Sequence, residues 1–186
     1  MFMCNALRLM TQSPWLARRQ EAEHGLGIEY QVGDAKNLGL GPNYDLVVAA
    51  YLLNYASDRA ELAAMCRGIA SSLKPGGRFV TVNCNPALDF RRAPSYRPYG
   101  FETRTTDDYR EGAPITWTFH LDDGLFSIEN YYLDVALHEA AFRDAGFSTI
   151  RWHPPRLSPQ GEQEFGAPFW RPFLKHPPAT FIECVK

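Results

Sequence analysis

In the stretch IEYQVGDAKNL, from Ile28 to Leu38, the carboxylate of Asp34 lies where a predicted strand ends and a polar loop begins. Asp34 follows the apolar part of this stretch and Gly33, so we expect its carboxylate at the carboxyl end of the strand. A carboxylate in that position can accept a hydrogen bond from the loop backbone two residues further on, which forms an Asx turn. It can also accept one from a bound group. The residue types alone leave both interpretations open.

Two further side chains have the chemistry of a general base, Tyr55 and His120. A positioned base is needed where an oxygen or nitrogen nucleophile must lose its proton. Each residue has a structural alternative, because Tyr55 can cover the helix that follows it and residues of a predicted hairpin are often packing residues. Trp117 and His120 lie three positions apart on that hairpin, so they should point to opposite faces and at most one should face inward.

Composition restricts the class of protein and of ligand. The chain has 186 residues, 45% of them hydrophobic and 22% charged, which is typical of one soluble globular domain. The formal net charge of −2 does not favour nucleic acid or an anionic membrane as a partner. Arginines between residues 90 and 110 alternate with acidic residues, which indicates a solvated segment rather than a phosphate-binding surface.

The cysteines and the first residues argue against a metal site and a membrane span. Cys4, Cys66, Cys84 and Cys184 are scattered, with no CxxC pair and no histidine at ligand spacing, so we predict no metal site. Cys66 and Cys84 lie in apolar patterns and are expected in the core. Reduced thiols suit a cytoplasmic enzyme. The opening MFMCNALRLM is interrupted by polar residues and resembles neither a signal peptide nor a membrane span.

The positioning elements alternate between helices and strands in the first half of the chain. SPWLARRQEAEHG (13–25) has a capping serine, an early proline and a closing glycine, so it predicts a helix. YDLVVAA (44–50) is apolar without alternation, which is typical of a strand buried on both faces. A helix is predicted from Asp58 to Leu73, followed by the KPGG stop (74–77) and the strand RFVTVNC (78–84). Its apolar stripe is Leu62, Met65, Cys66, Ile69 and Leu73. Strand, helix and strand form a crossover unit, which predicts parallel pairing.

The second half predicts a long loop, a hairpin, a helix and two closing strands. Residues 86–112 are rich in Pro, Arg and Tyr and show no period, so we expect a functional loop. ITWTFHLDDGLFSIENYY alternates on both sides of Asp122-Asp123-Gly124, which predicts a hairpin. A helix is expected over 134–145, with Leu137, Ala140, Ala141 and Ala145 on one side, and FSTIRWH and ATFIECV are expected strands. The order places the chain in the α/β class.

Three segments, taken in order, resemble the middle of the class I S-adenosylmethionine-dependent methyltransferases. They are VGDA, YDLVVAAYLLNYA and SSLKPGGRFVTV, with ALHEAAFRDAGFSTIRWH behind them. Within that superfamily AAYLLNYA, FSIENYY and PPATFIECVK are most similar to small-molecule methyltransferases of the toxoflavin-synthase type. The resemblance implies a Rossmann-like seven-stranded sheet, mostly parallel, with an antiparallel last strand. It also implies that S-adenosylmethionine binds at the carboxyl ends of the strands, as ligands do in doubly wound sheets.

The resemblance also implies roles for individual residues. Asp34 would accept a hydrogen bond from the adenine amino group, and the backbone N–H of Ala35 would serve an adenine ring nitrogen. The backbone at Ala49, Ala50 and Tyr51 would approach the methionine portion of the cofactor. Asn54 and Tyr55 would face the transferred methyl group or the substrate. Trp117 and Trp170 are candidate substrate-lining residues. The aromatic tail formed by Phe165, Phe169, Trp170 and Phe173 would be a lid over a flat substrate or, equally, a flap packed on the core.

The front of the family pattern is absent from this sequence. The family begins with a strand, a glycine-rich loop and a second strand ending in an acidic residue, and nothing before Asp34 matches them. About 50–70 residues are needed for such units. We therefore interpret 13–186 as a partial methyltransferase domain and 1–12 as an unmatched leader, and we expect weak or no cofactor binding. The strand ending near Asp34 should pair directly with 44–50 or remain an unpaired edge.

The partial domain divides into three expected regions. Residues 13–85 form the cofactor half without its glycine-rich loop, 86–132 the loop and hairpin on the substrate side, and 133–186 the C-terminal helix and strands. The predicted activity is methyl transfer to a nitrogen or oxygen atom of a small molecule. The alternatives are a non-catalytic remnant that serves as a binding module and a nicotinamide-dependent reductase. The reductase would need a glycine fingerprint and usually a Tyr-x-x-x-Lys pair, and the sequence has no such pair. The sequence does not indicate an oligomeric state.

Overall fold

The computed structural model describes residues 3–5 and 13–186 of the chain. The predicted leader of residues 1–12 therefore lies outside the described residues except for Met3–Asn5, which form β1. The core of the fold is a four-stranded mixed sheet in the order β3-β4-β9-β8, made of Tyr44–Ala50, Leu73–Cys84, Ala179–Val185 and Thr149–His153. β3 and β4 pair in parallel, and β9 pairs antiparallel with both β4 and β8. The antiparallel last strand is therefore confirmed.

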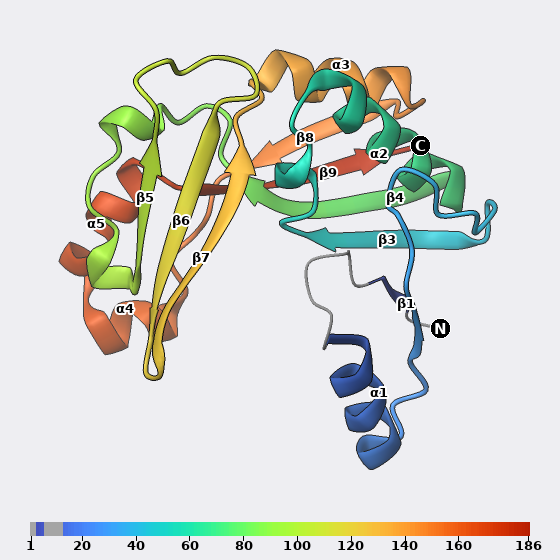
Figure 1. The fold of residues 1–186 in the computed structure, drawn as a ribbon, viewed down its shortest axis with the longest axis horizontal. Coiled ribbons are helices and arrows are strands. Elements are labelled where there is room, and N and C mark those ends of the chain that lie inside the picture. Colours follow the sequence, from blue (N-terminus) through green and yellow to red (C-terminus); the bar gives the residue numbers. More distant parts are fainter. Residues whose placement is uncertain (1–2, 6–12) are drawn as a thin grey trace.

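Two helices cover one face of this sheet (Figure 1). Helix α2 (Arg59–Ser72) begins at the predicted cap, where the Asp58 carboxylate accepts from the backbone N–H groups of Ala60 and Glu61. The predicted stripe of α2 is buried throughout. Helix α3 (Val135–Asp144) packs Phe142 against Phe79 of β4, with ring centroids 6.3 Å apart. The stripe predicted for this helix is wrong at Ala140, which is exposed, because His138 and Phe142 take the inward positions with Ala141.

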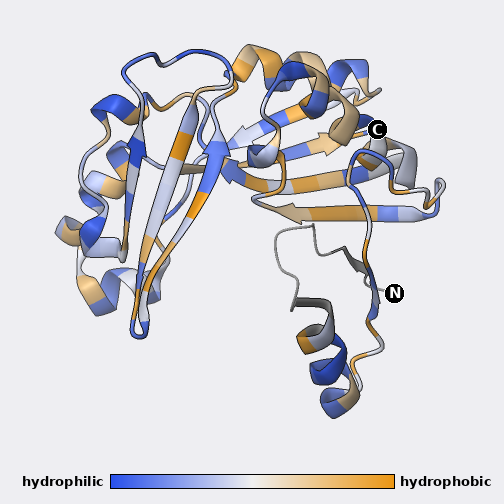
Figure 2. Ribbon diagram, viewed as in Figure 1, coloured by the Kyte–Doolittle hydropathy of each residue, from blue (hydrophilic) through white to orange (hydrophobic). Residues whose placement is uncertain are grey.

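The open face of the sheet contradicts the expectation that β3 is buried on both faces. Leu46 and Val48 are 44% and 67% exposed, while Ala49, which points the other way, is buried. Figure 2 shows the apolar stretches of β3 and β4 side by side. The physical reason is that β3 is the edge strand and, in the described part of the chain, α2 and α3 cover only the opposite face. The lack of apolar–polar alternation in the sequence of β3 therefore does not show that both faces of the strand are buried.

The first segments form a small unit of their own. Helix α1 (Ser13–His24) has the predicted bounds, and β2 (Glu29–Gln31) pairs in parallel with β1. Neither predicted alternative holds, because β2 neither pairs with β3 nor remains unpaired. It pairs in register with Met3–Asn5 instead. Figure 1 shows this unit beside the edge of the main sheet.

A second sheet of three antiparallel strands stands next to the main one, in the order β5-β6-β7 (Figure 1). The predicted hairpin is confirmed as β6 (Pro114–Leu121) and β7 (Gly124–Tyr131). β5 (Phe101–Thr105) pairs with β6, which corrects the expectation of an unstructured loop over 86–112. That segment also contains the 3-10 helices η2 (Phe90–Arg92) and η3 (Arg97–Tyr99). The C-terminal segment adds α4 (Pro159–Phe165) and α5 (Ala167–Lys175) before β9.

Candidate functional site

The loop at Asp34 adopts the turn that its sequence allows. The Asp34 carboxylate accepts a hydrogen bond from the Lys36 backbone N–H at 2.9 Å, and the Asp34 carbonyl accepts one from the Asn37 N–H at 2.9 Å. This is the Asx-turn geometry. The Asp34 side chain is nevertheless exposed and carries further acceptor capacity. The structural role is therefore present, and it is compatible with a ligand-binding role.

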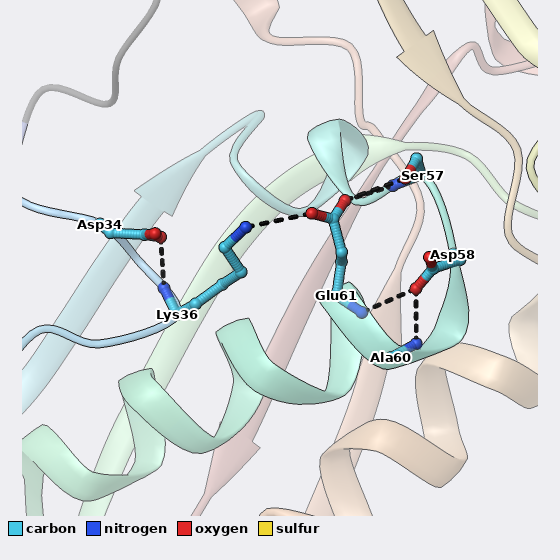
Figure 3. Close-up of polar contacts among 6 residues, drawn as sticks. All are labelled: Asp34, Lys36, Ser57, Asp58, Ala60 and Glu61. Atoms are coloured by element: carbon cyan, nitrogen blue, oxygen red, sulfur yellow. Dashed lines mark hydrogen bonds and ion pairs between the residues drawn. The ribbon is translucent and has the colours of Figure 1, made fainter.

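Helix α2, rather than the main sheet, holds this loop in place (Figure 3). The Lys36 ammonium lies 3.0 Å from the Glu61 carboxylate at the start of α2. Ala35 is 1% exposed, and its carbonyl oxygen packs so closely on Gly68 that a Cβ at that position would collide with it. The absence of a side chain at Gly68 thus lets the loop backbone sit directly on the helix. The sequence analysis did not single out Gly68, although a glycine inside a helix usually signals such a close approach.

The carboxyl end of β3 is the strained part of the chain. Among the described residues, Tyr51 is the only non-glycine residue with a positive φ, at 54°. Its backbone N–H donates to the carbonyl of Val82 on β4 at 2.8 Å, which ties the turn to the sheet. Ala49 is buried and Ala50 is exposed. Strained backbone of this kind concentrates at ligand sites because the surrounding structure must hold it in place.

Asn54 and Tyr55 lie on the 3-10 helix η1 (Leu53–Tyr55) directly after that turn. The Asn54 side-chain carbonyl accepts from the backbone N–H of Cys84 at 2.9 Å, so this residue joins η1 to the end of β4. Tyr55 is half-buried, and burial raises the pKa of its hydroxyl, against a hydrogen bond with Asn130 that lowers it. A raised pKa disfavours the phenolate, so it weighs against Tyr55 as a general base at neutral pH.

The hairpin residues Trp117 and His120 point to opposite faces, as their spacing predicts. Trp117 is buried, edge-on to Phe90 and stacked on Phe101, with centroids 5.6 and 5.5 Å apart. His120 Nε2 lies 3.0 Å from the Glu102 carboxylate on the other face. Neither residue contacts the strand ends at Asp34 or Tyr51 through a hydrogen bond or a ring contact. The structure thus places Trp117 in the core of the second sheet and gives His120 a carboxylate partner on its surface.

The aromatic tail is packed against η3. Trp170 stacks on Tyr99 with centroids 5.6 Å apart and donates from its indole N–H to the Gly161 carbonyl at 3.0 Å. Phe169 and Phe173 meet the same Tyr99 ring edge-on. Burial of Tyr96 in this cluster, where it is 1% exposed, adds to the packing. These contacts favour the interpretation of the aromatic tail as a packed flap over its interpretation as a lid on a substrate.

Further polar residues, which the sequence analysis missed, gather where β4 ends. Asn83, Asn130 and His138 are all buried, and Asn83 Nδ2 lies 3.3 Å from His138 Nε2. Together with Asn54 and Cys84 they bring η1, β4, β7 and α3 to one point. A small cavity of about 10 Å³ lies there, lined in part by Asn54, Asn83 and His138. The signal was present in Asn83 and Asn85, which flank Cys84 where the strand RFVTVNC ends, at the sheet edge where ligands of α/β proteins bind.

The described residues hold neither a metal-binding cluster nor a membrane-spanning helix. No cluster of three or more His, Cys, Asp or Glu side chains suited to a metal ion occurs among them. None of the described helices is long and apolar enough to cross a lipid bilayer. Cys66, Cys84 and Cys184 are buried free thiols, and the predicted core positions of Cys66 and Cys84 are confirmed.

Comparison with known proteins gives a family match over part of the chain and a shared fold. Residues 9–77 match the sequence model of a family described as "Methyltransferase domain". No curated protein matches the chain. The segment that matches the family contains the Asp34 loop, the strained turn at Tyr51 and helix α2.

Solved structures share the architecture over nearly the whole chain. An S-adenosylmethionine-dependent methyltransferase from Clostridium acetobutylicum is 14% identical with a TM-score of 0.64, over 98% of this chain and 75% of that one. One from Mesorhizobium loti is 20% identical with a TM-score of 0.62, over 97% and 78%. The CcbJ methyltransferase from Streptomyces caelestis is 18% identical with a TM-score of 0.61, over 96% and 72%. At these identities the likeness shows a shared fold.

Proposed function

We propose that this chain, whose residues 9–77 match a methyltransferase domain family and whose fold is shared with S-adenosylmethionine-dependent methyltransferases, transfers a methyl group from S-adenosylmethionine to a nitrogen or oxygen atom of a small molecule. The observation that carries the proposal is the strained backbone of Tyr51 at the carboxyl end of β3, beside a parallel partner strand. Ligands of open α/β sheets bind outside the carboxyl ends of the strands. Strain at this point is what a backbone-lined ligand site would need.

The residues present fit S-adenosylmethionine as the cofactor, which supplies an activated methyl group on a sulfonium when bound. Asp34 has an exposed carboxylate that can accept from an amino group such as that of adenine. Ala35 follows it in the same turn, but at 1% exposure its backbone is covered by the protein itself. Ala50 and Tyr51 are exposed at the strained turn, where the backbone can approach a bound methionine portion. These assignments are part of the proposal.

In this proposal the side chains position the acceptor and exclude water more than they move protons. Holding the reacting atoms in line lowers the barrier by removing translational and rotational freedom. Asn54 and Tyr55 follow the strained turn and lie where an acceptor would meet the cofactor. Of the two candidate bases, Tyr55 has a pKa raised by burial, and His120 lies on the second sheet with no hydrogen bond or ring contact to Asp34 or Tyr51. The proposed reaction therefore favours an acceptor that is nucleophilic in its neutral form.

Calorimetric titration of the chain with S-adenosylmethionine tests the cofactor assignment, with Asp34→Ala as the probe variant. A hydrogen bond to a charged group contributes about 1.5–3 kcal/mol, so this variant should bind at least roughly tenfold more weakly. Asp45→Ala is the matched control, because Asp45 is an exposed carboxylate at the opposite end of β3, paired with Lys74. Equal losses in both variants would contradict the adenine role of Asp34.

The strength of binding by the unaltered chain is a separate measurement. Saturable binding of S-adenosylmethionine supports the cofactor assignment, and no detectable binding would count against it. Transfer of labelled methyl groups to a panel of small nitrogen and oxygen nucleophiles then tests the proposed reaction. Labelling confined to macromolecules would overturn the small-molecule acceptor.

A further inference from the structure

The cavity at the end of β4 is lined by uncharged side chains, several of which are polar and buried. Asn54, Asn83 and His138 are 3%, 1% and 4% exposed and line it together with Cys84. Phe90 and Ile115 supply apolar walls, and half-buried residues such as Tyr131 and Asn85 form its rim. Its volume of about 10 Å³ is roughly what one water-sized group needs.

The hydrogen bonds around His138 fix the orientation of Asn83. His138 Nδ1 lies 2.8 Å from the Asp134 carbonyl oxygen, which can only accept, so Nδ1 carries the proton. Burial lowers the pKa of His138, so the ring is neutral and Nε2 accepts. Asn83 must then present its Nδ2 to Nε2, at 3.3 Å. The side-chain oxygen of Asn83 is left buried without a partner among the described residues.

A backbone contact fixes the orientation of Asn54 in the same way. Its side-chain oxygen accepts from the Cys84 backbone N–H at 2.9 Å, which can only donate. The Asn54 Nδ2 group is therefore the free end, and it too is buried without a partner among the described residues. The cavity is thus lined by one amide that lacks an acceptor for its N–H and another that lacks a donor for its oxygen. Buried polar atoms without partners are uncommon and point to a missing hydrogen-bonding group.

The charge of the walls restricts the chemistry of that group. No Lys, Arg, Asp or Glu is among the lining residues, and burial raises the pKa of the Cys84 thiol, which therefore stays protonated. Burying an ion against neutral walls costs far more than burying a neutral polar group. One atom that donates to Asn83 and accepts from Asn54 satisfies both amides, and a hydroxyl oxygen has this capacity.

We propose that this cavity is an acceptor subsite that anchors a neutral hydroxyl group of the methyl acceptor, which donates to Asn83 Oδ1 and accepts from Asn54 Nδ2. The inference rests on the proposed function and adds the class of group that the substrate carries. Asn54 belongs to the helical turn that follows Tyr51, and Cys84 ends the strand that pairs with β3. The subsite therefore lies at the sheet edge where the cofactor is proposed to bind. Asn83 and Asn54 act as specificity-determining residues, and His138 positions Asn83.

NMR of the side-chain amides in the full chain tests the proposal with methanol as the hydroxyl probe. Formate and methylammonium serve as charged probes of similar size. We expect methanol to shift the side-chain amide signals of Asn54 and Asn83 saturably, and the charged probes to leave both unmoved. Equal shifts with the charged probes, or no saturable shift with methanol, would overturn the proposal.

The variant Asn83→Leu should abolish the methanol-dependent shift of the Asn54 amide, whereas Asn43→Leu should preserve it. Asn43 is the matched control because its exposed amide donates to the Leu40 carbonyl, away from the cavity. If Asn83→Leu does not fold, a crystal structure of the wild-type chain with methanol decides. The methanol oxygen is expected at hydrogen-bond distance from both amides, and an empty cavity or a water that methanol does not displace would refute the subsite.

A parallel titration with S-adenosylmethionine separates this inference from the proposed function. Cofactor binding without a methanol response refutes the subsite and leaves the function standing. A methanol response without cofactor binding supports the hydroxyl site and counts against the function.

Discussion

Helices α1 and α2 both have the bounds that the sequence predicts, yet they differ in what they contribute to the fold. Along α2, Leu62, Met65 and Ile69 are at most 4% exposed and lie in the main hydrophobic core. On α1, Trp15 and Leu16 are 66% and 43% exposed. Local pairs stabilise its surface instead, namely Arg19 over the Trp15 ring at 4.9 Å and an ion pair between Arg19 and Glu23.

The difference shows that the residues that set the ends of a helix are not the residues that decide whether the helix packs into the core. Capping residues, proline and glycine decide where a helix begins and ends, because they satisfy or break the terminal backbone hydrogen bonds. Whether the helix packs depends on an apolar stripe at helical spacing, which α2 has and α1 lacks. Most helical stability in proteins comes from such packing. We therefore expect the stability of the chain to reside in α2 and its neighbours.

The largest contrast is expected from truncating one leucine in each helix. Leu62→Ala should lower the free energy of unfolding by about 2–5 kcal/mol, because Leu62 is fully buried and its removal leaves a cavity. Leu16→Ala should change it by less than about 0.5 kcal/mol, as expected for an exposed position. Denaturant unfolding followed by circular dichroism measures both. Similar losses in the two variants would contradict the division of the molecule into a packed and a peripheral part.

A smaller effect is expected where the Asp34 loop rests on α2. Gly68→Ala places a Cβ against the Ala35 carbonyl, so we expect a net loss of about 2 kcal/mol from overpacking, after the gain in helix propensity. The amide resonances of residues 34–37 should shift with it. Gly33→Ala is the control, since a Cβ there meets no atom within 4 Å. An unshifted loop in Gly68→Ala would show that α2 does not hold Asp34.

The smallest effect is a pH dependence that only the packed part should show. Burial lowers the pKa of His138 in the folded state, although the hydrogen bond to the Asp134 backbone carbonyl and the charge of Asp134 oppose the shift. The unfolded chain takes up this proton near the ordinary value of 6.5, so stability should fall as the pH drops below about 6.5. His138→Gln should flatten this dependence, and His24→Gln on exposed α1 should leave it unchanged. Equal slopes for wild type and His138→Gln, measured by unfolding between about pH 7 and pH 5, would count against a buried neutral His138.

The sequence predicted most elements because their signals are local. The cap at Asp58 and the two-residue turn between β6 and β7 act through neighbouring residues, and both appear where expected. Helix α2 does end before KPGG, but the expected start of the next strand at residue 78 is wrong, because β4 begins at Leu73 and includes KPGG. β5 was missed because Phe101–Thr105 is short and largely polar and becomes a strand by pairing with β6 across residues 106–113. The exposure of Val48 was missed for a related reason, since burial depends on which elements cover a face.

The same distinction separates the parts of the candidate site. The sequence by itself determined the Asx turn at Asp34, the strand that ends at Ala50 and the opposite faces of Trp117 and His120, because these follow from residue type and spacing. Only the tertiary structure brought Asn54, Asn83 and His138 to one cavity and pressed Ala35 onto Gly68. These contacts join η1, β4, α3 and the Asp34 loop, which are far apart along the chain. Their geometry is fixed by helices packing on a sheet, and no local pattern encodes it.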